Sequence, residues 1–279
     1  MIAGMIGAHS FNSEGICGVN WDVEIVSLRV TVDGVHSSTM AMIEAIEIAQ
    51  EQTIPILNIS MLRSSDIDTL DLISAIQQYS GLIVCAAGND GKNLDELLDM
   101  YPRSIDSDKM IIVGACTSHD VPWYRSNYHP EDVDLFAPGA PILSCYPMSL
   151  CDEGCSLGYH QARGYHQSSG TSYAAPYVAG VASLLLSMYS DQIMSPEALI
   201  YHLKFGVDTS SAYHEKCETG GRLNAYKVLS WHSFTNVYDY YNSTYHKASC
   251  ICSGYRFEPH TWINTGDMEI CSGCGYMGG

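Results

Sequence analysis

The chain has 279 residues, 46% of them hydrophobic, enough to bury a core in one large domain or two ordinary ones. Asp and Glu number 31 against 13 Lys and Arg, so the formal net charge is −18 at pH 7. A charge of that sign repels phosphate backbones and anionic membrane surfaces, which excludes nucleic acid as an expected partner.

Neither of two apolar stretches has the pattern of a membrane-directed segment. Val178–Met188 falls short of the roughly 18 consecutive apolar residues that a spanning helix needs. Met1–Ala8 has no basic segment before it and no cleavage site after it, as a signal peptide would. We therefore expect neither a transmembrane segment nor a signal peptide within residues 1–279. The 11 cysteines leave the redox compartment open.

Apolar runs of strand length alternate with longer segments of helical period from Gly18 to Leu229. This pattern predicts an α/β fold, with a mainly parallel sheet flanked by helices. Thr171–Tyr189 is apolar on nearly every side, so we expect a helix through the middle of the domain rather than on its surface. The other predicted elements are the strands Val23–Val30, Ile54–Ser60, Leu82–Ala87 and Met110–Cys116, and the helices Ser38–Gln50, Asp66–Tyr79 and Pro196 to about Leu203.

The composition changes after Ser230. Residues 232–279 are rich in Tyr, Ser, Asn, Gly and Cys, with too few aliphatic side chains to build a core without a cross-link or a metal. We therefore place a domain boundary near residue 231, between a larger domain of residues 1–231 and a Cys-rich tail of residues 232–279.

Ser172 stands at the start of the predicted buried helix, in the segment Gly170-Thr-Ser-Tyr-Ala-Ala-Pro-Tyr-Val-Ala-Gly180. The unpaired N–H groups and the dipole of a helix N-terminus favour a developing negative charge, which suits a nucleophile. This segment resembles the nucleophile signature of the subtilases, the subtilisin-like serine proteases. The resemblance implies a serine endopeptidase in which Ser172 attacks a peptide carbonyl.

A second segment, Ile83-Val-Cys-Ala-Ala-Gly-Asn89-Asp-Gly, is similar to the subtilase strand whose asparagine donates to the oxyanion. Asn beside Gly is also an ordinary turn sequence, so the order of motifs along the chain decides the interpretation. The resemblance extends over residues 1 to about 230 and gives Asn89 the oxyanion role. The landmarks that follow Asn89 in the family's order are Tyr101-Pro102, Val113-Gly-Ala115, Ala137-Pro-Gly139 and Gly220-Gly-Arg-Leu-Asn-Ala225.

The subtilase triad is incomplete in this sequence. The family orders it as Asp, His and Ser, and the His opens a His-Gly-Thr-His-Val-Ala-Gly helix. Met1-Ile-Ala-Gly4 resembles the end of that motif, which places the catalytic His three residues before Met1 and the Asp earlier still. His166, six residues before Ser172, is the nearest candidate for a substitute base. Because loss of the base costs subtilisin about 10⁶ in rate, we expect the chain as written to be nearly inert.

The resemblance also implies a cleft in which an extended peptide binds between two chain edges. One edge lies at Val35–Ser37. The other is Asn58–Arg63, where Leu62 and Arg63 replace the family's glycines, so the side-chain preference stays open. The substrate-binding residues implied are Val35, Ser37, Ser60, Leu62, Gly88, Gly170 and Thr171.

Catalysis of this kind needs no cofactor, but two segments suggest metals. The loop His9–Ile16, with Asn12 and Glu14, resembles one that holds calcium in some subtilases. In the tail, paired cysteine hooks of ribbon-like spacing suit one tetrahedral structural zinc, with disulfides or free thiols as the alternatives. The hook cysteines are Cys250, Cys252, Cys271 and Cys274, with His246 and His260 as candidate substitutes.

The other cysteines have simpler interpretations. Those in or beside apolar runs are expected to be small core residues. Those in the loop before Ser172 are expected to be ordinary loop residues, with one disulfide or a redox-sensitive thiol as the alternatives. The first group is Cys17, Cys85 and Cys116, and the second is Cys145, Cys151 and Cys155.

The sequence thus predicts a subtilase catalytic domain that lacks its Asp and His segments, acting on protein or peptide substrates. Three hypotheses remain open: an active protease whose natural chain extends upstream, a pseudoenzyme or peptide-binding module that keeps the cleft, and a fragment with no stable fold. The family implies an extracellular or cell-surface location, and the oligomeric state is undetermined.

Overall fold

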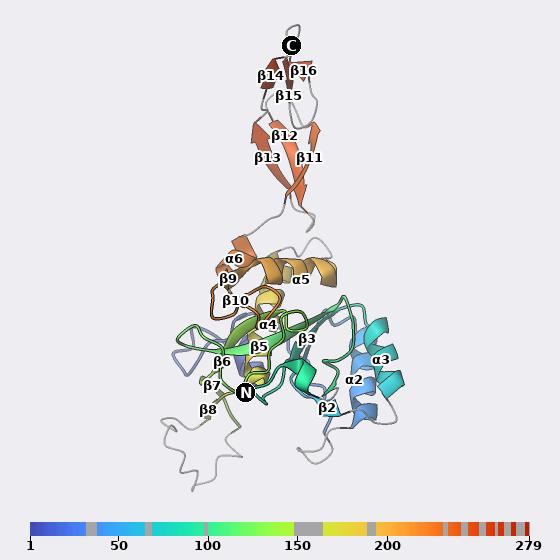
Figure 1. The fold of residues 1–279 in the computed structure, drawn as a ribbon, viewed down its shortest axis with the longest axis vertical. Coiled ribbons are helices and arrows are strands. Elements are labelled where there is room, and N and C mark those ends of the chain that lie inside the picture. The colour runs from blue at the N-terminus through green and yellow to red at the C-terminus, as the bar shows by residue number, and fades with distance from the viewer. Residues whose placement is uncertain are drawn as a thin grey trace. The chain divides into compact units, whose positions relative to one another are not determined.

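The computed structural model describes residues 1–31, 38–64, 69–97, 100–147, 164–188 and 194–230, and the backbone of short strands between residues 234 and 278. The chain divides into two compact units, which we call unit 1 and unit 2 (Figure 1). Unit 1 comprises Met1–Met188 with Ser195–Leu229, and unit 2 comprises Tyr189–Met194 with Ser230–Gly279.

A six-stranded sheet forms the centre of unit 1, in the order β1-β3-β5-β6-β10-β9. Every neighbouring pair is parallel except β10 and β9. The strand β3 is buried throughout and β5 up to its last residue, as expected for a parallel sheet covered on both faces. The expected α/β class with a mainly parallel sheet is confirmed. The strands are β1 (Ile56–Ile59), β3 (Leu82–Ala86), β5 (Met110–Thr117), β6 (Leu135–Ala140), β9 (Val207–Thr209) and β10 (Gly221–Leu223).

The helix α4 (Thr171–Met188) packs against β1, β3, β5 and β6. Its sequence is apolar on nearly all sides, and Ala175, Val178 and Leu185 are fully buried. Small side chains let neighbouring segments approach closely: a Cβ on Gly180 would lie 2.6 Å from the Cβ of Val19. The prediction of a helix through the middle of the domain is confirmed.

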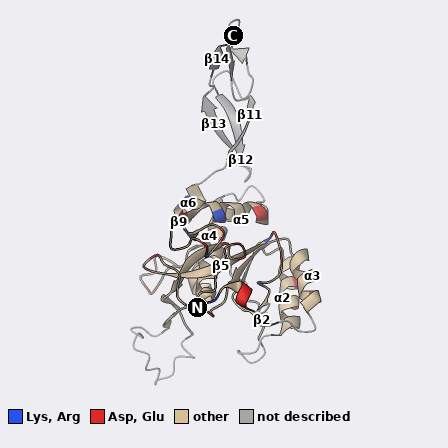
Figure 2. Ribbon diagram, viewed as in Figure 1, with Lys and Arg blue, Asp and Glu red and all other residues tan. Residues whose placement is uncertain are grey.

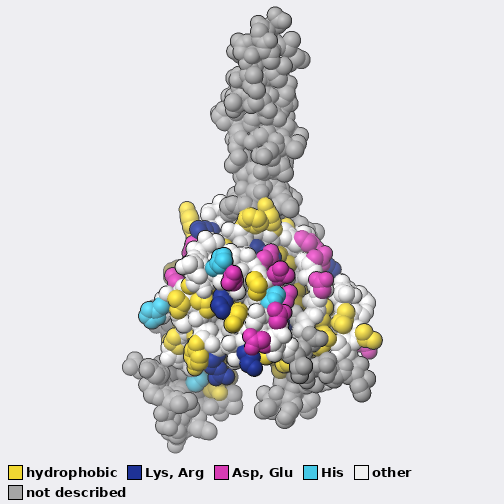
Figure 3. All heavy atoms as spheres, viewed as in Figure 1, with side chains coloured by type: hydrophobic (Ala, Val, Ile, Leu, Met, Phe, Trp, Pro, Cys, Tyr) yellow, Lys and Arg dark blue, Asp and Glu magenta, His cyan; other side chains and the backbone are white. Residues whose placement is uncertain are grey.

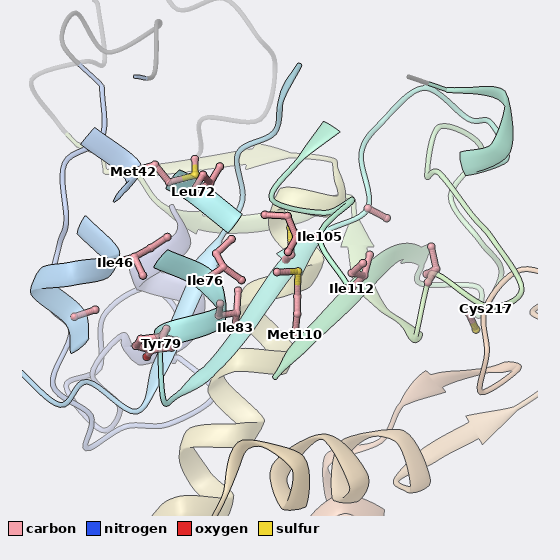
Figure 4. Close-up of a cluster of buried hydrophobic side chains, with 14 of the residues drawn as sticks. Met42, Ile46, Leu72, Ile76, Tyr79, Ile83, Ile105, Met110, Ile112 and Cys217 are labelled. Atoms are coloured by element: carbon pink, nitrogen blue, oxygen red, sulfur yellow. The ribbon is translucent and has the colours of Figure 1, made fainter. Parts of the chain in front are cut away.

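The helices α2 (Thr39–Glu51) and α3 (Thr69–Gln78) pack side by side and contribute to a second apolar layer (Figure 1). The α2 helix begins after Ser38, whose Oγ accepts a hydrogen bond from the N–H of Ala41 at 3.5 Å. Figure 4 shows side chains from both helices meeting residues of β3 and β5. This cluster includes Met42, Ile46, Leu72, Ile76, Ile83, Met110 and Ile112.

Shorter elements complete unit 1. The helix α1 contacts α4 and β7, which places the first residues of the chain against the domain core. Among the described residues, no helix is both long enough and apolar enough to cross a membrane. The remaining elements are α1 (Ile2–Gly7), β2 (Arg63–Ser64), the 3₁₀ helix η1 (Leu94–Glu96), β4 (Met100–Tyr101), β7 (Ile142–Cys145), β8 (Tyr165–Ser168), α5 (Pro196–Phe205) and α6 (Ala225–Ser230).

Two expectations for unit 1 are wrong. The segment Val23–Val30 forms no strand, because a strand needs a hydrogen-bonded neighbour and none lies beside it among the described residues. Its side chains Ile25 and Val26 are 40% and 43% exposed. Cys17, expected in the core, is exposed, since it lies in the loop that follows α1 rather than in a buried run.

Unit 2 contains two three-stranded antiparallel sheets, β11-β12-β13 and β14-β15-β16. In each sheet the first cysteine of a hook lies opposite an aromatic residue: Cys250 pairs with Phe234, and Cys271 pairs with Trp262. The strands are β11 (Phe234–Tyr240), β12 (Tyr245–Cys250), β13 (Tyr255–Pro259), β14 (Trp262–Asn264), β15 (Glu269–Cys271) and β16 (Met277–Gly278).

Candidate active site

Ser172 is the second residue of α4 and therefore lies at the N-terminus of this helix. Its Oγ donates a hydrogen bond to the carbonyl oxygen of Ser60 at 3.0 Å. In return, Ser60 Oγ donates to the carbonyl oxygen of Ser172 at 3.1 Å. These reciprocal bonds join residues from distant parts of the chain and fix the start of α4 beside the segment that follows β1.

Pro176 explains why the carbonyl of Ser172 is available to Ser60. In an α-helix this carbonyl would accept from the N–H four residues later, and proline has no N–H. The freed acceptor is therefore paired by a side chain from outside the helix.

Asn89, just after β3, is held against the first residue of α4. Its Oδ1 accepts hydrogen bonds from the backbone N–H of Thr171 at 2.8 Å and from Thr171 Oγ1 at 3.1 Å. A backbone N–H can only donate, so the atom facing it must be the amide oxygen, and Nδ2 occupies the other branch of the carboxamide. A Cβ on Gly170 would lie 3.6 Å from that Nδ2. The Asn89 amide donor is thus fixed beside the residue that precedes Thr171 and Ser172.

Thr171 ties the helix to the sheet. Its fully buried side chain accepts a hydrogen bond from the N–H of Gly88 at 3.0 Å while donating to Asn89. Gly88 has φ +102°, a conformation that side chains rarely adopt, and a Cβ there would lie 2.5 Å from Asn127 Nδ2. Glycine is therefore required at the turn that carries Asn89.

Asn127 is a positioning residue that the sequence analysis missed. Its side chain, fully buried, accepts from the N–H groups of Asp90 and Lys92 at 2.9 and 3.3 Å. It donates to the carbonyl of Ala87 at 3.2 Å and to Asp90 Oδ2 at 3.0 Å. Asn127 thereby holds the whole turn around Asn89. It lies in a polar loop segment without periodicity, so no pattern in the sequence distinguishes it.

The expected substrate-binding residues are only partly described. Gly88, Gly170 and Thr171 adjoin Asn89, whereas Val35 and Ser37 lie outside the described residues. Leu62 is half-buried, and its Cδ1 lies 3.2 Å from where a Cβ on Gly88 would be. The side chain that replaces a family glycine therefore occupies space directly beside the Asn89 turn.

His166 lies in β8, opposite Ser144 of β7, and its ring packs on Tyr146 with centroids 5.1 Å apart. The hydrogen bond that the structure gives Ser172 Oγ goes to a backbone carbonyl rather than to an imidazole.

The buried thiols are poor nucleophiles. Burial raises the pKa of Cys85 to about 12, although nearby Arg103 partly opposes the shift, and burial raises the pKa of Cys116 to about 11. Both are free cysteines and stay protonated at neutral pH, in keeping with their predicted role as core residues.

The candidate metal segments differ in how far they are described. Asn12 Oδ1 accepts from the N–H of Glu14 at 3.0 Å, so it serves a local turn in an exposed loop. Within the described part of the chain, no three His, Cys, Asp or Glu residues are grouped so that they could hold a metal ion. Cys252, Cys274 and His260 lie outside the described residues, and only the backbone is described for Cys250, Cys271 and His246.

The described site thus combines a mainly parallel α/β sheet, a buried helix whose second residue is Ser172, and Asn89 held against the first residue of that helix. The subtilase family model matches residues 1–215, and the chain belongs to the subtilase family.

Individual relatives agree with that assignment. Halolysin of Haloferax mediterranei is 32% identical over 204 residues, which are 73% of this chain and 35% of halolysin. Subtilisin DY of Bacillus licheniformis is 30% identical over 189 residues, 67% of this chain and 62% of that protein. The crystal structure of a cold adapted subtilisin-like serine proteinase matches with a TM-score of 0.64 and 27% identity, covering 80% of this chain and 72% of that one. The chain thus spans less than two thirds of the length of the first two relatives.

Proposed function

We propose that unit 1 carries the nucleophile half of a subtilisin-like serine endopeptidase site. Ser172 Oγ attacks the peptide carbonyl carbon, and Asn89 Nδ2 donates to the oxygen that becomes negative. The N–H of Ser172, unpaired within the first helical turn, is a second donor. The observation that carries the proposal is the pairing of Asn89 Oδ1 with Thr171, which fixes the amide donor next to the nucleophile.

The attack needs a base to take the hydroxyl proton and return it to the leaving amine. We propose that this histidine, and the aspartate that orients it, belong to polypeptide outside residues 1–279, as the likeness of Met1–Gly4 to the end of the histidine motif implies. Residues 1–279 alone are then inert as a peptidase.

A peptide-binding module without catalysis is the second candidate. It is favoured by the hydrogen bond from Ser172 Oγ to the Ser60 carbonyl, which directs the hydroxyl proton at a group that cannot act as the base. In this alternative the cleft edge near Ser60 and Leu62 still binds an extended peptide, and Ser172 helps to shape it.

The experiment that decides between these functions is hydrolysis of a fluorogenic peptide by residues 1–279, by a longer product of the same reading frame that includes a His-Gly-Thr segment, and by Ser172→Ala of each. The peptidase proposal expects hydrolysis only by the longer product, lost in its Ser172→Ala variant. A longer product that binds the peptide without cleaving it would instead establish the binding module.

Leu62 is proposed to restrict the side chain accepted beside the Asn89 turn. Leu62→Gly is expected to improve binding of a peptide ending in Phe relative to one ending in Ala by roughly tenfold or more, because it removes the four side-chain carbons of a half-buried leucine from the proposed pocket wall. Fluorescence anisotropy with labelled tetrapeptides measures the ratio of the two Kd values. Leu62→Met keeps the side-chain volume nearly unchanged and should keep the ratio of the two Kd values. A ratio unchanged in Leu62→Gly would remove Leu62 from the pocket.

Protein or peptide is the proposed substrate class, and nucleic acid is not. The net charge of −18 supports this, as does the face drawn in Figure 3, where acidic, basic and hydrophobic side chains are interspersed. The α5 helix also carries both signs, with Glu197 in its first turn and Lys204 in its last (Figure 2). An extracellular or cell-surface location remains a proposal on the family resemblance.

For the tail we propose a structural zinc held by Cys250, Cys252, Cys271 and Cys274, and for the loop of Asn12 and Glu14 a calcium site. Four thiolates match the tetrahedral preference of zinc. Binding of the ion would stabilise a tail that has too few aliphatic side chains to form a core. Neither metal takes part in the proposed chemistry.

A further inference from the structure

A buried arginine lies beside the turn that carries Asn89. Arg103 is 5% exposed, and its Nη1 donates a hydrogen bond to the carbonyl of Ala87 at 2.7 Å. The same nitrogen lies 3.3 Å from where a Cβ on Gly88 would be. Because Gly88 has no side chain, the guanidinium comes close to the backbone of the turn directly before Asn89.

The turn after β4 holds Arg103 in place. The N–H of Met100 donates to Ser104 Oγ at 3.0 Å, and the N–H of Ser104 donates to the carbonyl of Met100 at 3.1 Å. Ile105 is buried in the apolar cluster that Figure 4 shows. The backbone on both sides of Arg103 is therefore anchored, and its charge has a defined position.

Arg103 shares its surroundings with Leu62. Leu62 Cδ1 lies 3.2 Å from the position of a Cβ on Gly88, so Leu62 and Arg103 Nη1 approach the same point. Leu62 is the residue proposed above to bound the pocket for the peptide side chain beside Asn89. An apolar wall and a positive charge therefore meet at one place in that pocket.

The positive charge of Arg103 acts on the groups around it. Burial raises the pKa of the Cys85 thiol to about 12, and the charge of Arg103 works against that rise. A guanidinium presents five N–H donors in a planar fork that matches the geometry of a carboxylate. In a buried setting, a hydrogen bond between opposite charges is stronger than at an exposed surface. Arg103 therefore favours a negative charge in the space beside it.

The sequence around this turn reverses the overall charge of the chain. The two-stranded sheet of β2 and β4 places a second arginine, Arg63, one strand away from the turn of Arg103. Within residues 63–64 and 100–105, both charged residues are arginines, although the chain has 31 acidic and 13 basic residues. The β2–β4 sheet and its turn are thus locally basic in sequence.

We propose that Arg103 is a specificity-determining residue of the candidate active site, which selects peptides with an acidic side chain, Asp or Glu, at the residue whose carbonyl meets Ser172. The carboxylate enters the pocket beside Leu62 and accepts hydrogen bonds from the guanidinium. This inference rests on the proposed function, because it needs a peptide whose carbonyl lies at Ser172 and Asn89. It does not need that peptide to be cleaved.

The test compares peptides that differ in one charge. Fluorescein-Ala-Ala-Ala-Glu amide and fluorescein-Ala-Ala-Ala-Asp amide are titrated with residues 1–279 by fluorescence anisotropy, each beside its neutral counterpart ending in Gln or Asn. We expect at least one acidic peptide to bind about tenfold more tightly than its neutral counterpart, because charge-assisted hydrogen bonds are stronger than neutral ones. Equal Kd values within both pairs, or binding of none of the four peptides, would overturn the proposal.

Variants of Arg103 test whether the preference comes from this side chain. Arg103→Gln removes the charge and should lower the ratio of the neutral to the acidic Kd to about one. A merely structural effect on the Asn89 turn would instead weaken all four peptides alike and leave that ratio unchanged. Arg103→Lys keeps a charge without the fork, and it serves as the test if Arg103→Gln does not fold. Its ratio should fall by about threefold.

Arg125→Gln is the matched control for the loss of one positive charge. Arg125 is exposed, and its carbonyl accepts a hydrogen bond from the N–H of Gly91 at 2.9 Å, so it also lies beside the Asn89 turn. The variant should leave the ratio of Kd values unchanged. Equal decreases of the ratio in Arg103→Gln and Arg125→Gln would show that the preference reflects the general charge of the protein, and the role given to Arg103 would be wrong.

Cleavage is judged separately from this preference. A longer product that hydrolyses Glu and Gln peptides, and likewise Asp and Asn peptides, with equal kcat/KM would keep the proposed peptidase function and refute the acidic preference. An acidic preference in binding without hydrolysis by the longer product would keep the role of Arg103 and assign the site to a peptide-binding module.

Discussion

A fluorophosphonate probe is expected to leave Ser172 of residues 1–279 unlabelled, at the level of the Ser172→Ala variant. The probe reacts with a serine only as fast as a base removes the hydroxyl proton, and here that hydroxyl donates to the carbonyl of Ser60. In subtilisin, loss of the base alone costs about 10⁶ in rate. A longer product with the histidine and aspartate should therefore label about 10⁴ to 10⁶ times faster than residues 1–279, measured by in-gel fluorescence over time.

The controls for the labelling experiment separate the active protease from the binding module and test for a substitute base. Ser172-dependent labelling of residues 1–279 would show that another base operates, with His166 the first to test by His166→Ala. If the longer product also stays unlabelled yet binds peptide, the cleft is a binding module.

Asn127→Ala is expected to lower the free energy of unfolding by about 2–4 kcal/mol, measured by urea denaturation. The side chain is fully buried and makes four hydrogen bonds, to Ala87, Asp90 and Lys92. Truncation leaves two N–H groups and a carbonyl without this partner, and each such loss costs about 1–3 kcal/mol unless water enters. The turn that carries Asn89 would loosen at the same time.

Asn93→Ala is the matched control, because Asn93 lies just after the Asn89 turn and its side chain accepts one exposed hydrogen bond, from the N–H of Asp95 at 3.0 Å. Loss of this hydrogen bond should lower the free energy of unfolding by no more than about 1 kcal/mol. Equal decreases in the free energy of unfolding of the two variants would show that Asn127 has no special role in holding the turn. A cooperative transition of the parent chain would also count against a fragment without a stable fold.

Elements in the core were predictable from sequence because their burial is continuous. The apolar runs of β3 and β5 and the all-round apolar α4 have one stable arrangement, a covered parallel sheet. Ser172 and Asn89 were found because their motifs keep a fixed order along the chain. Their roles as nucleophile and oxyanion donor remain predictions.

Other features depend on partners that the local sequence does not reveal. Val23–Val30 has the composition of a buried strand, but a strand also needs a neighbouring edge, and none lies beside it among the described residues. Asn127 lies far from Asn89 in sequence and carries no motif, so its role is visible only in its hydrogen bonds. The side chain of Leu62 is a recognisable departure from the family in the sequence, but its position beside the Asn89 turn is visible only in the structure.

The reciprocal bonds between Ser60 and Ser172 join residues 112 positions apart. Thr171 and Gly88 are likewise separated by 83 positions. Contacts of such sequence separation form late in folding, since the chain entropy of closing long loops must first be overcome. The Ser172 hydroxyl is therefore expected to stay unaligned until α4 has docked against β1 and the turn after β3. The geometry around Ser172 is thus a product of the folded sheet and not of the local sequence at the start of α4.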